Sequence, residues 1–354
     1  MVYYPLVKGN DWYATRAAFN GDWSAFEGTL KPTGVSADGR FCLNNAKGMP
    51  KGTMNIASGI EVQSTGKTFK IGAVTGTGRL GGSCSLSSSS SGVNTWQVGS
   101  SDTDFEFGGS ITGSGTRFEK VGSGTMTLTG QGSDNTGTNT ISEGTLCLNN
   151  SKATKPMTGS GQLTVKNGAA LTGVGRLGGT VVVNSGALLR PGVKENSMSG
   201  TLDFGGQSVT ISRGGTLQFY LSSQSLYTKL TNIDQLVLNG RLVVKVRENI
   251  SGLAVGKEFQ LWSADNTAAN IEEIRLDPLP DALYWDITDL STSGVLRITD
   301  DPELAVHAIP SSPVVVNVEY FDINGRRISN PTYGLYIVRL HFSDGTVKVK
   351  KENR

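Results

Sequence analysis

Short stretches in which apolar and polar residues alternate run through most of the chain. Residues 162–165 (Gln-Leu-Thr-Val) and 180–184 (Thr-Val-Val-Val-Asn) are two examples. A period of two is typical of a strand with one buried face. Apolar positions at the 3.6-residue period of an amphipathic helix are interrupted throughout by glycine or β-branched residues, which disfavour helix. The pattern therefore predicts an all-β protein.

A four-residue phrase recurs along the chain: a polar or small residue, glycine, a small residue and an aliphatic residue. Its instances begin at Glu27, Ser123, Glu143, Ser185, Ser199, Gly214 and Asn239, with a variant at Asn167. From Gly124 onward the glycines are 14 to 25 residues apart. A strand-turn-strand unit of this size cannot bury its apolar face alone, whereas stacked units bury a continuous column. We predict a right-handed parallel β-helix over 1–225, with the glycine at positive φ at each corner; an ordinary β-sandwich is the alternative.

A longer duplication relates 41–45 to 146–150 and 75–82 to 172–179, which implies two blocks of several coils. If coils rise about 4.8 Å each, Cys42 and Cys147 lie roughly 20 Å apart, beyond the ~7 Å Cα limit of a disulfide. Three cysteines are also too few for a disulfide scaffold or a close-spaced zinc site. We therefore expect Cys42, Cys84 and Cys147 to be small core residues that form no cross-link.

The remaining chain divides into three parts. Longer strands with bulky apolar residues predict that 226–299 is the C-terminal, capping part of the β-helix. Acidic residues and prolines in 300–313 indicate a linker. Residues 314–354 alternate around two hairpin signals, Asn324-Gly325 and Asp344-Gly345, and predict a small antiparallel β-sandwich.

Charge does not select a partner for this chain. Its 32 basic and 30 acidic residues leave a net charge of +2, which provides no long-range field for nucleic acid or an anionic membrane. No apolar run reaches the ~18 residues of a membrane-spanning helix. The first residues lack the basic and apolar regions of a signal peptide, so we expect that an exported protein would begin upstream of Met1.

Residues 118–192 resemble the passenger-associated strand repeat of autotransporter-type β-helices. The residues that carry this resemblance are Lys120-x-Gly122-x-Gly124-Thr125-x-Thr127-Leu128, the phrase at Glu143, and the run from Gly173 to Gly192. Residues 200–261 are similar to the terminal part of such passengers. No autotransporter membrane barrel follows in this sequence.

The C-terminal module resembles the sorting domain of type IX secretion cargo. The residues that carry the motif are Asp322, Asn324, Gly325, Arg326, Gly334, Tyr336, Asp344 and Gly345. The resemblance implies export across the outer membrane by the type IX secretion machinery, often with anchoring to surface polysaccharide. It implies a secreted protein or one on the outer surface of a Gram-negative bacterium.

Candidate chemistry is sparse. Asp102, Asp104 and Glu106 alternate with two phenylalanines, which predicts three carboxylates on one face of a strand. Such a strand could bind calcium or serve a polysaccharide lyase or glycosidase, but a solvated face over a phenylalanine core is the simpler interpretation. The only histidines, His307 and His341, lie outside the expected solenoid, which leaves it without a Ser-His-Asp triad or a histidine-based metal site.

Two further patterns have plain structural interpretations. Gly-x-Gly-x-x-Gly occurs at Gly76 and at Gly173, but no helix is predicted after either, so we expect β-helix corners and no nucleotide cofactor. Trp12, Trp23 and Trp96 could stack on sugar rings if exposed, although buried tryptophan is commoner.

The sequence thus favours a non-catalytic, surface-displayed β-helix that acts as a stalk, adhesin or glycan-contacting module. It predicts no cofactor and no metal. The first alternative is a β-helix polysaccharide lyase or glycosidase that uses the acidic strand. The second is the non-catalytic C-terminal part of a larger surface enzyme.

Overall fold

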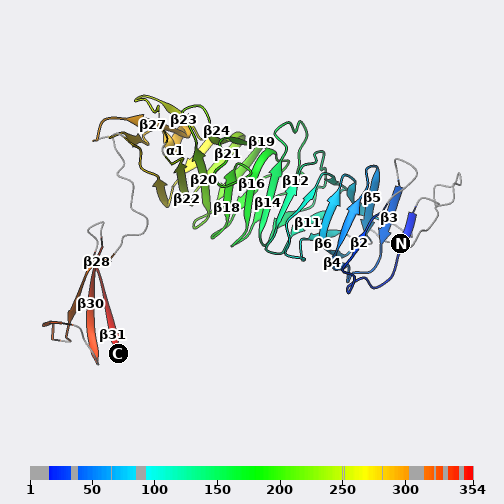
Figure 1. Cartoon of the computed structure of the whole chain (residues 1–354), viewed down its shortest axis with the longest axis horizontal. Coiled ribbons are helices and arrows are strands. Elements are labelled where there is room, and N and C mark those ends of the chain that lie inside the picture. The colour runs from blue at the N-terminus through cyan, green and yellow to red at the C-terminus, as the bar shows by residue number, and fades with distance from the viewer. Residues whose placement is uncertain are drawn as a thin grey trace.

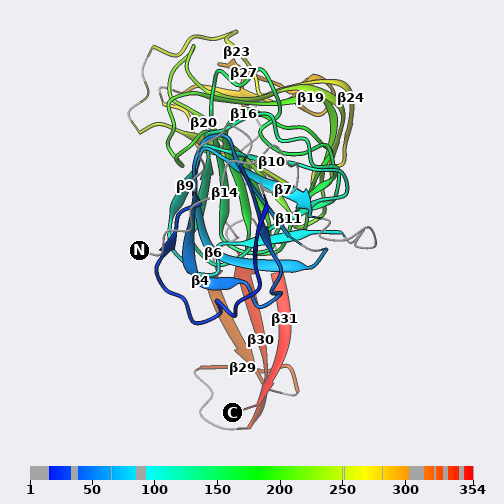
Figure 2. The ribbon, with the colours of Figure 1, turned by 90° about the vertical axis from the view of Figure 1, so that its right-hand side faces the viewer.

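Parallel strands stacked along one axis make up most of this computed structural model (Figure 1). The structure describes residues 16–32, 39–64, 66–84, 93–248, 250, 252–280, 282–302, 315–322, 324–329, 334–342 and 347–353. Within these ranges the one helix is a single turn, α1 (Leu290–Ser293). Figure 2 looks along the long axis, where successive coils lie over one another. The predicted all-β fold with a parallel β-helix is confirmed.

Three parallel sheets, A, B and C, form the sides of the β-helix. Sheet A contains β1 (Arg16–Phe19), β3 (Gly39–Leu43), β5 (Ile60–Ser64), β7 (Arg79–Ser83) and β10 (Ser110–Ile111). Sheet B contains β2 (Thr29–Leu30), β4 (Met49–Ile56), β6 (Thr68–Gly76), β8 (Thr95–Val98), β11 (Arg117–Lys120), β13 (Asn139–Ile141), β15 (Leu163–Val165), β17 (Val181–Val183), β19 (Gly200–Ile211), β21 (Thr228–Leu238) and β24 (Trp262–Ala269). Sheet C contains β9 (Phe105–Phe107), β12 (Thr125–Leu128), β14 (Thr145–Asn149), β16 (Ala170–Arg176), β18 (Leu188–Pro191), β20 (Thr216–Leu221), β22 (Arg241–Val246) and β25 (Glu273–Leu276).

An inward-facing residue at or next to the repeated phrase supplies a core column along sheet C. In the Ser185 instance this residue is Leu189, because Leu188 of the phrase itself is only half-buried. In-register pairing stacks, in order, Phe105, Met126, Leu146, Leu171, Leu189, Leu217 and Leu242. All seven side chains are buried. Two instances of the phrase, at Gly28 and Gly200, lie instead in sheet B, on β2 and β19. The phrase therefore marks two different corners of the coil.

Glycine is required at these corners for two different reasons. Gly144 has a φ of +64°, which residues with a Cβ rarely adopt, as predicted. Gly124 does not have a positive φ, but an added Cβ would lie 2.2 Å from the carbonyl oxygen of Thr103 on the preceding coil. The expectation of positive φ at every corner was therefore too general, because close stacking of coils also excludes a side chain.

A small antiparallel sheet, D, follows the parallel coils. It contains β23 (Glu258–Gln260), β27 (Val295–Thr299) and β26 (Tyr284–Asp286). Phe259 and Trp285 are buried in it with their rings edge to face, 6.0 Å between centroids. Trp262, at the start of β24, is also fully buried and stacks on Phe219 of β20. Large aromatic residues thus fill this end of the core.

The C-terminal residues form a four-stranded antiparallel sheet, E. Its order is β29 (Arg327–Ile328), β28 (Val315–Phe321), β30 (Leu335–Phe342) and β31 (Val347–Asn353). The antiparallel character predicted for this module is confirmed, and the described strands lie in a single sheet. None of them pairs with a described strand of the β-helix. Most of the predicted linker lies outside the described residues.

The prediction that the cysteines form no cross-link was wrong. Cys42 and Cys84 form a disulfide with their Cα atoms 6.0 Å apart. The separation argument applied to Cys42 and Cys147, whereas Cys84 follows β7 and returns beside β3. Its N–H donates to the carbonyl oxygen of Ser64, on the strand between them (2.9 Å). Cys147 remains a free, buried cysteine, as expected.

Candidate functional site

Of the three predicted carboxylates only Glu106 lies in a strand, because β9 begins at Phe105 and both Asp102, at a φ of +57°, and Asp104 precede it. Glu106 accepts a hydrogen bond from the hydroxyl of Thr129 (3.4 Å), whereas the two aspartates accept from the protein's own backbone. Phe105 and Phe107 are buried. Asp102 accepts a hydrogen bond from the N–H of Ser123 (2.8 Å), and Asp104 accepts one from the N–H of Thr125 (2.7 Å). Both donors belong to the next coil. These two acids therefore couple neighbouring coils by satisfying backbone donors at a corner.

A buried lysine next to this strand was missed at the level of sequence. Lys120 is fully buried in a sheet B column, between Val98 and Ile141 of the neighbouring coils. Its ammonium group donates to the carbonyl oxygens of Val121 (2.8 Å), Gly122 (2.8 Å) and Glu143 (3.3 Å). The burial of Lys120 could have been predicted from the sequence. In a strand, Lys120 points to the same side as Phe118, two residues before it, and Phe118 is expected to point inward.

The environment of Lys120 explains how a charge is accommodated in the core. Burial lowers the pKa of this lysine to about 8, while the negative charges of Glu143, Asp102 and Asp104 act in the opposite direction. Three carbonyl acceptors also favour the protonated form. Lys120, the lysine of the Lys-x-Gly-x-Gly stretch, therefore has a structural role. Its ammonium group hydrogen-bonds to carbonyl groups of its own coil and of the next coil.

A polar depression of about 550 Å³ lies on the outer side of sheet A, and we call it the N-terminal depression. It is lined by Glu61, Arg79, Ser110, Thr112, Gln131, Gly132, Asp134 and Lys155, which come from successive coils. Glu61 and Arg79 form an ion pair at 3.4 Å. Asp134 accepts a hydrogen bond from the N–H of Gly113 (3.1 Å). Acidic and basic side chains therefore gather here, away from the predicted acidic strand.

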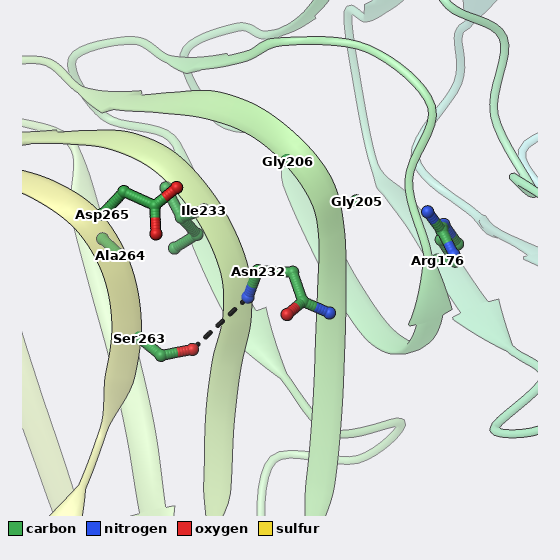
Figure 3. Close-up of a pocket in the computed structure, with 8 residues that line it drawn as sticks. All are labelled: Arg176, Gly205, Gly206, Asn232, Ile233, Ser263, Ala264 and Asp265. Carbon is green, nitrogen blue, oxygen red and sulfur yellow. Dashed lines mark hydrogen bonds between the residues drawn. The ribbon is translucent and has the colours of Figure 1, made fainter.

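A second depression, of about 400 Å³, lies further along the β-helix, and we call it the C-terminal depression (Figure 3). It is lined by Arg176, Gly205, Gly206, Asn232, Ile233, Ser263, Ala264 and Asp265. Asn232 adopts a positive φ of 55°, and its side chain donates to Asp203 (2.9 Å). The N–H of Asn232 donates to the hydroxyl of Ser263 (3.4 Å). Polar groups of three consecutive strands, β19, β21 and β24, thus form its wall.

Volumes of this size fall within the range of small-molecule sites, but the lining is unusual for one. Apart from Ile233 and Ala264, the residues around both depressions are polar, charged or glycine. Among the residues that the structure describes, no aromatic side chain lines either one. Surfaces of this kind suit a hydrated ligand rich in hydroxyl or charged groups more than an apolar one.

The glycine-rich fingerprints and the tryptophans have the predicted structural roles where they are described. Strands and not helices come after both Gly-x-Gly pairs: β7 begins at Arg79, within the Gly76 fingerprint, and β17 follows the Gly173 fingerprint. Trp96 is fully buried, and its indole N–H donates to the carbonyl oxygen of Gly81 (2.8 Å). Trp23 is half-buried against Phe26. Trp12 lies outside the described residues.

The described residues of the predicted sorting motif lie in the C-terminal module, Tyr336 in strand β30 and the others in the segments next to the strands of sheet E. Asp322 accepts hydrogen bonds from the N–H groups of Asn324 and Arg326 (both 2.9 Å), and Gly325 has a φ of +81°. The predicted turn at Asn324-Gly325 thus joins β28 to β29. Tyr336 is buried and donates to Glu352 (3.1 Å), while Gly334 precedes β30 at a φ of +90°. Asp344 and Gly345 lie outside the described residues.

The chain matches no protein-family model, and no curated protein matches it. In the described part of the chain, no cluster of three or more histidine, cysteine, aspartate or glutamate side chains is placed to hold a metal ion. The same residues include no helix that is long and apolar enough to cross a membrane. The fold therefore defines the class of protein, a parallel β-helix, and function has to be argued from its surface.

Proposed function

We propose that this chain is a secreted, surface-displayed β-helix that acts as a stalk or adhesin and contacts glycans through its flank. The observation that carries the proposal is the pair of open polar depressions on a scaffold whose apolar side chains are closed inside stacked coils. A solenoid of this kind presents a long, rigid surface, because each coil is held by its neighbours. Its polar wall suits carbohydrate hydroxyl groups.

Export by type IX secretion is the second part of the proposal. It is supported by the resemblance of the C-terminal module to sorting domains of that pathway. The Cys42–Cys84 disulfide also favours an extracytoplasmic location, since disulfides persist mainly in oxidising compartments. In this account the β-helix is the cargo and sheet E directs its export to the surface of a Gram-negative cell.

The export proposal can be tested with a reporter. Residues 314–354 fused to an inert secreted protein should carry it across the outer membrane in a host with type IX secretion. A matched fusion with Tyr336→Ser, which removes the buried ring from sheet E, should remain in the periplasm. Retention of the unmodified fusion in the periplasm would refute the sorting assignment.

A glycan-cleaving enzyme is the second candidate, and one observation favours it. Glu61, Arg79, Asp134 and Lys155 bring two carboxylates and two cations to one depression. Acid-base cleavage of a polysaccharide needs groups of both kinds. Both carboxylates already have partners in the protein, Arg79 for Glu61 and the N–H of Gly113 for Asp134. We therefore favour binding over cleavage at this depression.

A further inference from the structure

The two depressions lie on the same side of the β-helix, one after the other along its axis. Backbone hydrogen bonds connect the coils between them. The N–H of Gly132 donates to Pro156 (2.7 Å), that of Met157 donates to Arg176 (2.8 Å), and that of Leu177 donates to Asp203 (2.8 Å). Gly132 lines the N-terminal depression, and Arg176 lines the C-terminal one. The polar surface is therefore a single flank that continues through these coils.

Two cations from adjacent coils lie one in each depression. Lys155 precedes Pro156 and lines the N-terminal depression, whereas Arg176, on the next coil, lines the C-terminal one. Adjacent coils of a parallel β-helix are separated by about 4.8 Å, so the two side chains can contact successive groups of one extended ligand. Among the described residues, neither cation forms an ion pair.

The nearest carboxylates on this flank are already engaged. Asp134 accepts from the N–H of Gly113, and Asp203 accepts from the N–H of Gly205 (2.8 Å) and from the side chain of Asn232 (2.9 Å). Asp265 is exposed, but it lies at the far end of the C-terminal depression on β24. These hydrogen bonds do not neutralise the two aspartates, but they direct the carboxylate oxygens toward groups of the protein itself. Arg79 is paired with Glu61, so Lys155 and Arg176 are the described cations of the flank that have no carboxylate partner.

Glycines keep the backbone of the flank open beside these cations. An added Cβ at Gly132 would meet only the side chain of Lys155, at 3.8 Å. At Gly206 it would meet nothing within 4 Å, and at Gly205 it would lie 3.1 Å from the guanidinium of Arg176. The glycines therefore leave space beside both cations, although the N–H groups of Gly132 and Gly205 already donate within the protein. Of the three glycines, Gly206 is the exposed one.

We propose that this flank binds a linear anionic polysaccharide along the β-helix axis, with Lys155 and Arg176 paired to acidic groups on successive parts of the chain. The proposal rests on the glycan-contacting function above and specifies the class of glycan. The anionic groups are carboxylates of uronic acids or sulfate esters, because both pair with ammonium and guanidinium groups. Single-stranded nucleic acid is disfavoured, since the described residues that line the flank include no aromatic side chain for base stacking.

The test measures binding of the full chain to immobilised polygalacturonate, dextran sulfate and neutral dextran at two salt concentrations. Lys155→Gln combined with Arg176→Gln should weaken binding to the preferred anionic polymer about tenfold, as expected for two exposed ion pairs. Thr112→Trp, which fills the N-terminal depression without changing charge, should weaken it as well. The control, Lys51→Gln with Arg213→Gln, removes the same charge away from the flank and should leave binding unchanged.

Each outcome has one meaning. Preference for polygalacturonate identifies carboxylates as the partner, and preference for dextran sulfate identifies sulfate esters. Equal binding of neutral dextran would overturn the anionic class but leave the glycan-contacting function in place. Equal losses in the flank variant and in the control would show unspecific charge attraction and overturn the site. No binding to any of the three polymers would refute the inference, whereas retained binding to other neutral glycans would preserve the broader function.

Discussion

The β-helix and the C-terminal sheet E use the same local pattern, alternating strands, with very different results. In the β-helix, apolar positions stack in register from coil to coil, and the column from Phe105 to Leu242 is buried along its length. In the described part of sheet E only Tyr336 and Val338 are comparably buried. Val318, Leu335, Val347 and Val349 are exposed. Stacking closes a core that four strands in one sheet cannot close.

Charged groups differ between the two regions as well. In the β-helix, Lys120 is buried and saturated by backbone carbonyls. In sheet E, Glu319 lies among His341 (2.8 Å), Arg327 (3.3 Å) and Arg339 (3.7 Å), and the hydrogen bond from His341 is the main reason why its pKa is lowered. Ion pairs near the surface contribute little to stability, whereas an unpaired buried charge is costly. The two regions therefore differ in how much a single substitution should matter.

Loss of the disulfide should have the largest effect, and only in the β-helix. The bridge joins residues 42 positions apart, and closing a loop of this length restricts the unfolded chain by about 4 kcal/mol. The double variant Cys42→Ser with Cys84→Ser should lower the free energy of unfolding of the first coils by about 4 kcal/mol. Urea unfolding followed by hydrogen exchange would measure it. An unchanged midpoint in these coils would contradict the role assigned to the bridge.

Truncation of a core residue should come next. Leu171 is fully buried in the sheet C column, so Leu171→Ala should cost about 3 kcal/mol through lost burial and a cavity. The matched change in sheet E, Val349→Ala, removes a side chain that is 61% exposed and should cost less than about 0.5 kcal/mol. Denaturant unfolding of both variants compares the two regions directly. Similar losses would contradict the comparison.

The smallest expected effect is the change with pH in the free energy of unfolding that Lys120 causes. Its pKa is about 8 in the folded chain, against an ordinary lysine value of 10.5, so between these limits the unfolded state binds the proton more readily. Raising the pH through this window should therefore stabilise the native protein relative to Lys120→Met, by less than about 3 kcal/mol. Below pH 8 the difference should stay constant. Unfolding free energies at pH 7, 9 and 10.5 would test this, and a difference independent of pH would argue against a charged lysine in the core.

The sequence predicted features that depend on local alternation and repetition. The all-β class, the stacked apolar column, the inward phenylalanines of the acidic strand and the turn at Asn324-Gly325 all follow from spacing and turn chemistry. Lys120 was missed because a single charged residue on an inward face was not distinguished from its solvated neighbours.

Features that depend on how irregular segments stack were not predictable in the same way. The Cys42–Cys84 bridge requires Cys84 to return beside β3, which a spacing argument restricted to Cys42 and Cys147 did not consider. The flank takes residues such as Gln131, Gly132 and Lys155 from segments between the strands. Their common location follows from coil-to-coil hydrogen bonds, which leave no signal in the order of residues.

The most direct test of the central claim is to incubate the full chain with host and plant polysaccharides and to measure bound protein and released oligosaccharide in the same samples. A glycan-contacting β-helix without catalytic function should be retained on at least one polysaccharide and should release no oligosaccharide from any. Release that is lost in an Asp134→Asn variant would contradict the account and identify a glycan-cleaving enzyme that acts at the N-terminal depression.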